Sequence, residues 1–259
     1  MINSDPSGKV VWLTGAAGGL GVGIARRLAE EGYKLALHYL SNRSRAEKLQ
    51  ADLAESGYKT TLTKGDLSVP GIASDVYKSI VKELGIPYGL VHLAGPYVGK
   101  KIIDHSRKEF DEMVSGNLTS YFEAIKAVVP AMQENKLGRI IGTGMIGAHQ
   151  TTPMRFTGPH LAAKSAVVAL SRTLAIEEAV NGITVNVINP GHILHKELNR
   201  EEARAKKAGE THPMGVHGSW EDLADAIIYL LSPGASYVTG AVLEVTGGWM
   251  GEDYVYDTQ

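Results

Sequence analysis

The stretch Lys9-Val-Val-Trp-Leu13, followed directly by Thr14-Gly15-Ala-Ala-Gly18-Gly19-Leu20-Gly21, decides the fold that the sequence predicts. The apolar run is typical of a buried strand, and Ile24 and Leu28 then follow at helical spacing. Glycines between a strand and a helix let the backbone approach a pyrophosphate, whose charge the helix N-terminus stabilises. Because this turn lies in the first strand–helix unit, we predict a dinucleotide-binding site there.

Short apolar runs alternate with amphipathic stretches along the rest of the chain. We expect strands over residues 9–13, 35–39, 60–63, 89–93, 139–141, 183–188 and 241–245, and helices around residues 44–56, 72–84, 118–132, 159–178 and 221–231. Strands separated by helices of this length indicate βαβ crossovers and a parallel sheet. The sequence therefore predicts an α/β fold, a single Rossmann domain over residues 1–259 with a doubly wound, seven-stranded parallel sheet and helices on both faces.

Composition excludes several classes of protein. The 259 residues include 26 Lys+Arg and 28 Asp+Glu, a formal charge of −2 that disfavours a general nucleic-acid or anionic-membrane binder. Without cysteine there is no disulfide framework and no thiolate site. The start, Met1–Gly8, lacks the basic and apolar regions of a signal peptide, and no apolar run approaches the roughly 20 residues that span a bilayer. We expect a soluble, cytoplasmic protein.

Further motifs match the order and spacing of one family. Asp66-Leu67 follows the third expected strand, Leu93-Ala94-Gly95 follows the fourth, and Val185-Asn186-x3-Pro190-Gly191 closes the sixth. Tyr237-Val-Thr-Gly240 and Val245-Thr-Gly-Gly248 lie near the C-terminus. With the spacing Thr-Gly-x3-Gly-x-Gly in the first turn, residues 7–250 resemble the short-chain dehydrogenase/reductase family. The resemblance implies a nicotinamide cofactor held by Gly15, Ala17, Gly19, Leu20, Gly21, Asn42, Arg43, Ser44, Asp66, Leu67, Ala94, Gly95, Lys164, Pro190, Gly191 and Ile193.

The end of the second expected strand indicates which dinucleotide binds. Sites specific for NAD usually place an acid there for the ribose 2′-hydroxyl, whereas a 2′-phosphate requires cationic and donor groups. Here the strand ends at His38-Tyr39 without an acid, and Arg43 follows between Asn42 and Ser44. A guanidinium flanked by these side chains supplies charge-assisted hydrogen bonds to phosphate. We therefore favour NADP(H) over NAD(H).

The catalytic group implied by the resemblance is Asn, Ser, Tyr and Lys, and two of its members differ here. Asn117 and Lys164 match, but His160 stands at the tyrosine position and Met145 at the serine position. No tyrosine lies between Tyr121 and Tyr229. The segment from Met145 to His160 is two residues longer than usual, so a shifted alignment leaves other hydroxyls open, those of Thr143, Thr151 and Thr152.

Nearby positive charge affects the proton donor His160 differently from a tyrosine at the same position. It lies four residues before Lys164 on the same helix face, close to the helix N-terminus. Both positive charges disfavour the imidazolium form, and a neutral imidazole is a weak acid. Three functions stay open: an NADPH-dependent oxidoreductase reducing a carbonyl or conjugated small molecule, an NADP(H)-binding regulatory or structural subunit without hydride transfer, and a lyase or isomerase using His160 as acid and base.

The last third of the chain is rich in histidine and charge. His192 and His195 are three residues apart, but no acidic partner has convincing ligand spacing, and we expect no metal site. Residues 192–218 resemble a substrate lid, with a solvated helix over Glu197–Glu210. The apolar stripe over residues 118–132 fits either a buried core or a subunit contact. Related proteins pair this helix and the one after Pro159 across dimer faces, so the resemblance implies a homo-oligomer, a dimer or a tetramer. The substrate's identity is not readable from these residues.

Overall fold

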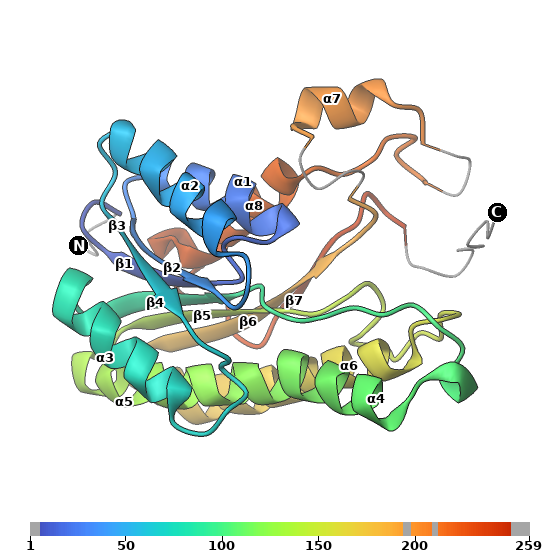
Figure 1. The fold of residues 1–259 in the computed structure, drawn as a ribbon, viewed down its shortest axis with the longest axis horizontal. Coiled ribbons are helices and arrows are strands. Elements are labelled where there is room, and N and C mark those ends of the chain that lie inside the picture. The colour runs from blue at the N-terminus through green and yellow to red at the C-terminus, as the bar shows by residue number, and fades with distance from the viewer. Residues whose placement is uncertain (1–5, 194–197, 209–211, 250–259) are drawn as a thin grey trace.

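The computed structural model describes residues 6–193, 198–208 and 212–249. Its helices and strands alternate in the predicted order (Figure 1). They are β1 (Val10–Thr14), α1 (Gly19–Glu30), β2 (Lys34–Tyr39), α2 (Arg43–Glu55), β3 (Thr60–Lys64), α3 (Ile72–Leu84), β4 (Pro87–His92), α4 (Arg107–Val114), the π-helical segment η2 (Ser115–Thr119), α5 (Ser120–Asn135), β5 (Gly138–Thr143), α6 (Gly158–Glu178), β6 (Ile183–Pro190), α7 (Arg200–Ala205), α8 (Trp220–Leu231) and β7 (Val242–Val245).

All seven strands form one parallel sheet, in the order β3-β2-β1-β4-β5-β6-β7. The chain builds β1 to β3 outward in one direction and then returns to place β4 on the other side of β1. The loops after β1 and β4 therefore diverge at the carboxyl edge of the sheet, which is where such folds bind their ligands. The predicted doubly wound, seven-stranded parallel sheet is confirmed.

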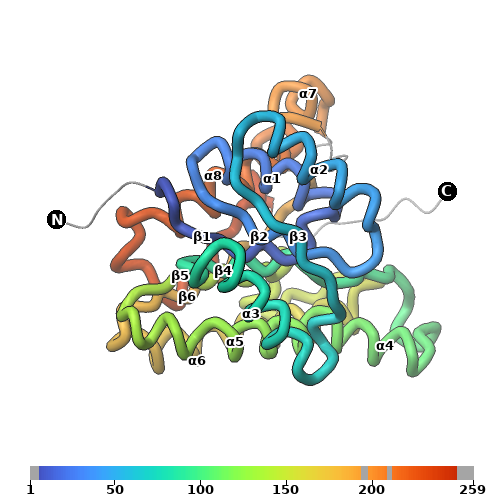
Figure 2. The backbone as a smooth tube through the Cα atoms, turned by 60° about the vertical axis from the view of Figure 1, so that its left-hand side comes forward, coloured from blue at the N-terminus to red at the C-terminus, as the bar shows by residue number. Residues whose placement is uncertain are grey.

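Helices cover both faces of the sheet (Figures 1 and 2). α1, α2 and α8 lie on one face, and α3, α5 and α6 lie on the other, with α4 beside α6. Side chains of β1 alternate between the two layers, as a strand requires. Val11 and Leu13 join the apolar core under α1 and α8, whereas Val10 and Trp12 join the core under α3 and α5. Burial on both faces explains why β1 is a continuous apolar run.

Two sequence predictions differ from the structure. The helix α4 was not expected, because it has few apolar residues. Its start is set by a capping box between Ser106 and Glu109. The expected charged helix over Glu197–Glu210 is wrong in its length. α7 ends at Ala205, and Lys207 pairs in an antiparallel bridge with Val216. No helix in the described ranges is long and apolar enough to cross a bilayer.

Candidate active site

The glycine-rich turn joins β1 to α1 at the carboxyl edge of the sheet. Gly15 has a φ of +70°, and a Cβ there would lie 3.0 Å from the backbone nitrogen of Ala94. A Cβ on Gly21 would lie 2.3 Å from the carbonyl oxygen of Gly15. Glycine is required at position 15 because the turn packs on the loop after β4, and at position 21 because the first turn of α1 packs on the glycine-rich turn itself. The N-terminus of α1, whose N-cap Gly18 provides no side-chain cap, is thus open to a phosphate.

A buried polar chain links β1, β4 and α5 behind this turn. The Nδ1 atom of His92 lies 3.0 Å from the hydroxyl of Thr14, and its Nε2 atom lies 3.1 Å from the hydroxyl of Ser120. The Ser120 hydroxyl donates to the carbonyl of Gly116 at 2.6 Å, and the Ala94 N–H donates to the Thr14 hydroxyl at 3.2 Å. Burial, and then the charge of Lys164, hold the pKa of His92 well below its usual range. A neutral ring protonated at Nε2 satisfies every partner.

Asn117 lies in the π-helical segment between α4 and α5. Its side-chain amide is fully buried, and Nδ2 donates to the carbonyls of Met113 at 2.9 Å and Pro96 at 3.0 Å. Its Oδ1 has no hydrogen-bond partner among the described residues, and a Cβ on Gly95 would lie 2.1 Å from it. The absence of a side chain at Gly95 therefore leaves room for the amide. The wider turn presents a fixed acceptor, and such turns occur often at functional sites.

Lys164 lies in the second turn of α6, 4% exposed. Its Nζ donates to the carbonyl of Thr143, the last residue of β5, at 2.7 Å. Burial lowers the pKa of Lys164 to about 8. Its ammonium group is thus held at the carboxyl end of the central strands, and its pKa lies close to neutral pH.

His160 lies one helical turn before Lys164. The ring of Tyr97, from the loop after β4, meets the His160 ring edge-on, with centroids 5.1 Å apart and an interplanar angle of 74°. No tyrosine lies in the stretch of sequence around His160. The structure brings one from a different loop, and no local signal in the sequence could have paired the two residues.

The expected serine position has no hydroxyl. Met145 packs partly buried against the apolar cluster of Ala148, Val168 and Val187. Of the threonines considered as replacements, Thr151 is exposed and donates to a neighbouring carbonyl. The hydroxyl of Thr143 is buried without a hydrogen-bond partner among the described residues. The backbone carbonyl of the same residue, Thr143, accepts the hydrogen bond from Lys164.

The expected 2′-phosphate residues follow β2. The Asn42 side chain caps α2 by accepting from the N–H of Arg45 at 3.2 Å, and Ser44 donates to Asn42 at 3.4 Å. Arg43 is exposed, and its Nε donates to Glu47 at 2.7 Å. Exposed pairs of this kind contribute little to stability, so the guanidinium is available for a stronger anion.

The remaining expected cofactor residues also lie at the carboxyl edge. Asp66 accepts hydrogen bonds from Ser68 after β3, and Leu67 is buried. Pro190 and Gly191 end β6, where the N–H of Gly191 donates to Val245 at 3.0 Å. Ile193 pairs with Gly218 in a parallel bridge. His195 lies outside the described residues.

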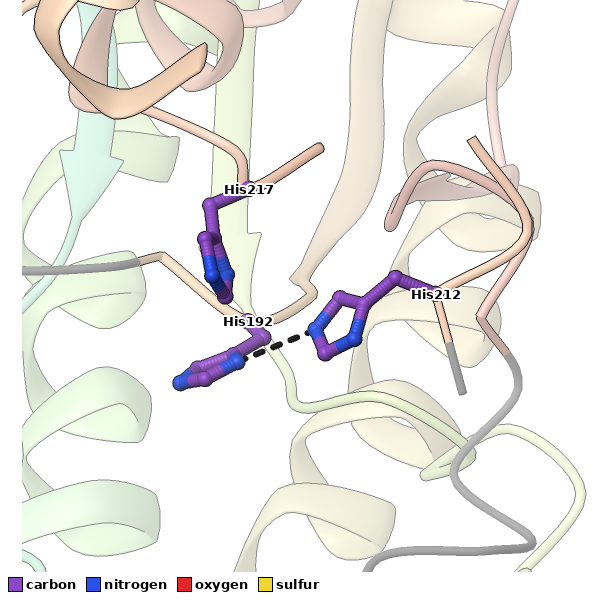
Figure 3. A group of neighbouring side chains, drawn as sticks. All are labelled: His192, His212 and His217. Atoms are coloured by element: carbon purple, nitrogen blue, oxygen red, sulfur yellow. Dashed lines mark hydrogen bonds between the residues drawn. The ribbon is translucent and has the colours of Figure 1, made fainter. Parts of the chain in front are cut away.

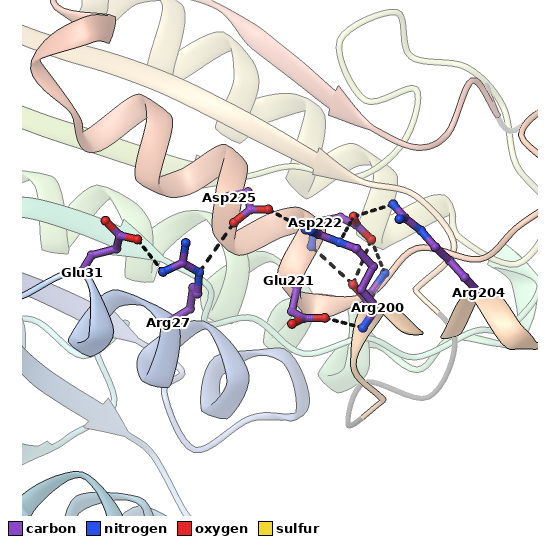
Figure 4. A network of polar contacts seen from close by, with 8 residues as sticks. Arg27, Glu31, Arg200, Arg204, Glu221, Asp222 and Asp225 are labelled. Carbon is purple, nitrogen blue, oxygen red and sulfur yellow. Dashed lines mark hydrogen bonds and ion pairs between the residues drawn. The ribbon is translucent and has the colours of Figure 1, made fainter. Parts of the chain in front are cut away.

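α7 is fastened to α8 by a charged network (Figure 4). Arg200 donates to Asp222 at 2.9 Å and to Asp225 at 2.5 Å, and Arg204 approaches Asp222 at 3.4 Å. Asp225 also lies 3.7 Å from Arg27 of α1. The described part of the expected lid thus has a defined anchor on the helical layer.

Comparisons with known proteins place the chain in a family through its sequence and its fold. The sequence model of the family described as enoyl-(acyl carrier protein) reductase matches residues 15–250. The chain is 33% identical over 240 residues to the provisionally named oxidoreductase YtkK of Bacillus subtilis, covering 91% of this chain and 94% of that protein. It is 34% identical over 244 residues to the 3-oxoacyl-(acyl-carrier-protein) reductase FabG of Vibrio cholerae, covering 93% and 97%. A short-chain dehydrogenase/reductase structure from Serratia marcescens superposes with a TM-score of 0.84 at 27% identity, covering 95% and 99%.

Proposed function

We propose, from the premise that the chain belongs to the short-chain dehydrogenase/reductase family, that it is an NADPH-dependent reductase of a carbonyl or conjugated small molecule. The observation that carries the proposal is the ammonium of Lys164, buried beside the end of β5 and one turn from His160. Relatives named for 3-oxoacyl and enoyl reduction support an acyl thioester as the substrate class. When bound, the reduced nicotinamide supplies the hydride.

The residues present fit a dinucleotide. Added Cβ atoms at Gly15 and Gly21 would collide with the backbone of Ala94 and of Gly15, so both glycines are needed to fold the tight turn that a pyrophosphate approaches in this proposal. In this proposal Asp66 and Leu67 border the adenine, and Pro190, Gly191 and Ile193 border the nicotinamide. The oxyanion or enolate of the substrate is stabilised by the positive charge of Lys164, and the Oδ1 atom of Asn117 holds a water in place.

Arg43 selects the phosphorylated cofactor in this proposal. The test is a parallel titration with NADPH and NADH of the wild-type chain and of Arg43→Ala. We expect NADPH binding to weaken about 10- to 100-fold in the variant, the size of one or two charged hydrogen bonds, with NADH unchanged. Arg107→Ala is the matched control, because Arg107 makes the same exposed pair four residues along, with Asp111 at 2.8 Å. Equal loss for both cofactors would refute the assignment.

His160 provides the proton in this proposal, with its ring positioned by Tyr97. The imidazolium population rises as pH falls, so turnover should increase from pH 8 toward pH 5. His160→Phe should lower the rate of NADPH oxidation with 3-oxoacyl and enoyl thioesters about 10²- to 10⁴-fold and leave NADPH affinity unchanged. A variant as active as the wild type would refute this role. Cofactor binding without turnover across the panel would favour a subunit that has lost hydride transfer, and turnover without cofactor oxidation would favour a lyase or isomerase.

The helical layer opposite α1 also suggests self-association. Phe122 of α5 is 39% exposed, while Ile176 at the end of α6 and Val180 just after it are 81% and 84% exposed. Ile125, Val129 and Met132 of the expected stripe belong to the core, but exposed large apolar side chains on a helix layer favour a homo-oligomer. Light scattering after size-exclusion chromatography tests this proposal, and Ile176→Lys should shift the mass toward the monomer.

A further inference from the structure

Three histidines that are distant in the sequence meet beside the exit of β6 (Figure 3). His192 follows Gly191, and His212 and His217 lie in the loop that leads into α8. One ligand nitrogen from each ring lies within 4.8 Å of the others. The Nδ1 atom of His192 and the Nε2 atom of His212 are 3.0 Å apart. The rings therefore converge on one point instead of facing outward.

The spacing of the three rings fits a transition-metal site. Zinc binds imidazole nitrogens at about 2.0–2.1 Å, so two ligands of a tetrahedral ion lie about 3.3 Å apart. The shortest observed pair, at 3.0 Å, is slightly closer than this, and no pair of ligand atoms is more than 4.8 Å apart. A water or another ligand would take the fourth position.

The buried ring of His217 also favours a bound ion. The ring nitrogen Nδ1 of His217 is buried without a hydrogen-bond partner among the described residues, and this side chain is only 9% exposed. A metal ion would supply a partner for a buried imidazole nitrogen.

The surrounding cavity has a volume of about 230 Å³ and carries acidic groups. Glu244 and Asp222 line it together with the three histidines. Arg204 also lines the cavity, but its guanidinium lies 3.4 Å from Asp222, and this carboxylate offsets the positive charge of Arg204. The balance of charge at the cavity wall does not oppose a divalent cation.

We propose that His192, His212 and His217 bind one divalent transition-metal ion, Zn²⁺ or a close analogue such as Co²⁺. Imidazole nitrogen suits these ions, whereas Mg²⁺ and Ca²⁺ require oxygen ligands. This proposal does not rest on the reductase chemistry, although His192 lies between Gly191 and Ile193, the residues that we assign to the nicotinamide border.

The metal would act as a clamp between two segments. His192 is adjacent to Gly191, and its carbonyl accepts the N–H of Gly218 at 3.3 Å. His212 and His217 belong to the segment that connects α7 to α8. One ion bound to all three would fix the loop before α8 against the end of β6, next to the expected nicotinamide position.

Calorimetric titration tests the site directly, with a full-length chain that carries no histidine tag and has been treated with a chelator. We expect one Zn²⁺ per chain and no binding of Mg²⁺. His212→Ala and His192→Ala should each weaken Zn²⁺ binding by more than about 100-fold, because loss of a direct ligand exceeds the loss of an outer partner. His105→Ala is the control, since His105 lies before α4 and outside the cluster, and it should bind Zn²⁺ like the wild type.

A thiolate variant makes the result independent of folding effects. The chain contains no cysteine, so His212→Cys introduces a single thiolate ligand. This variant should regain Zn²⁺ affinity, and with Co²⁺ it should show the visible bands of a tetrahedral site and a new sulfur-to-metal charge-transfer band. If the wild type binds no Zn²⁺, or if the three alanine variants bind it equally, the rings form an aromatic cluster with Trp249, which stacks on His212 at 5.7 Å, and the proposal is overturned.

Discussion

Replacing Lys164 with methionine should make the free protein more stable near neutral pH and inactive. Lys164 is buried, and this burial lowers its pKa from 10.5 to about 8. At about 1.4 kcal/mol for each tenfold change in proton affinity, holding the ammonium inside the fold costs about 3 kcal/mol at pH 7. The methionine keeps the length of the side chain and removes this cost.

The hydrogen bond to Thr143 works in the opposite direction. Methionine leaves that carbonyl without its donor, which costs about 1–3 kcal/mol. The net gain at pH 7 is therefore between zero and about 2 kcal/mol. The pH dependence of the unfolding free energy does not involve the carbonyl, so it tests the burial of Lys164 more directly than the stability at one pH does.

The direction of the pH effect follows from proton binding. Between about pH 8 and pH 10.5 the folded wild type binds fewer protons at Lys164 than the unfolded chain, so its unfolding free energy rises with pH in that window. From pH 7 to about pH 9.5 the wild type should gain about 2 kcal/mol relative to Lys164→Met. Urea unfolding of both chains at the two pH values measures the difference. Lys59→Met, at an exposed lysine, should show none. A flat difference for Lys164→Met would refute the reasoning.

Three further perturbations test other parts of the site. Gly21→Ala places a methyl carbon 2.3 Å from the carbonyl of Gly15, so calorimetry should show a loss of about 1–3 kcal/mol in unfolding free energy together with weaker NADPH binding. Tyr97→Phe keeps the ring against His160 and should retain turnover, whereas Tyr97→Ala should lower it; a large loss in the phenylalanine variant would assign chemistry to the hydroxyl instead. His92→Leu leaves two buried hydroxyls short of a partner and should cost about 1–3 kcal/mol in thermal unfolding, and an unchanged stability would exclude the proposed network.

The sequence predicted the sheet well because its signal is local. β1 is an apolar run buried on both faces, and the turn before α1 needs glycine for close contact with Ala94. The sequence did not predict helix α4, because this helix has no apolar stripe. A capping box sets its start. Tertiary packing then supplies the rest of its stability.

The candidate site was predictable only where it lies on a motif. Lys164 and Asn117 have fixed spacings from neighbouring elements, and the structure places both at buried positions. Tyr97 meets His160 across 62 intervening residues. The loop before α8 brings His212 and His217 to His192. Such pairs depend on how the loops fold over the carboxyl edge of the sheet. No periodicity in a single sequence predicts this loop packing.

The π-helical segment at Ser115–Thr119 has an evolutionary consequence. Successive residues of an α-helix are about 100° apart around its axis, so one additional residue offsets everything before it by about that angle relative to α5. Deleting one residue there would restore an ordinary helix and turn the amide of Asn117 out of its niche, while the apolar stripe of α5 would stay in register. A single-codon insertion or deletion at this point is therefore enough to switch the scaffold between a well-packed inert helix and one that offers an acceptor to a ligand.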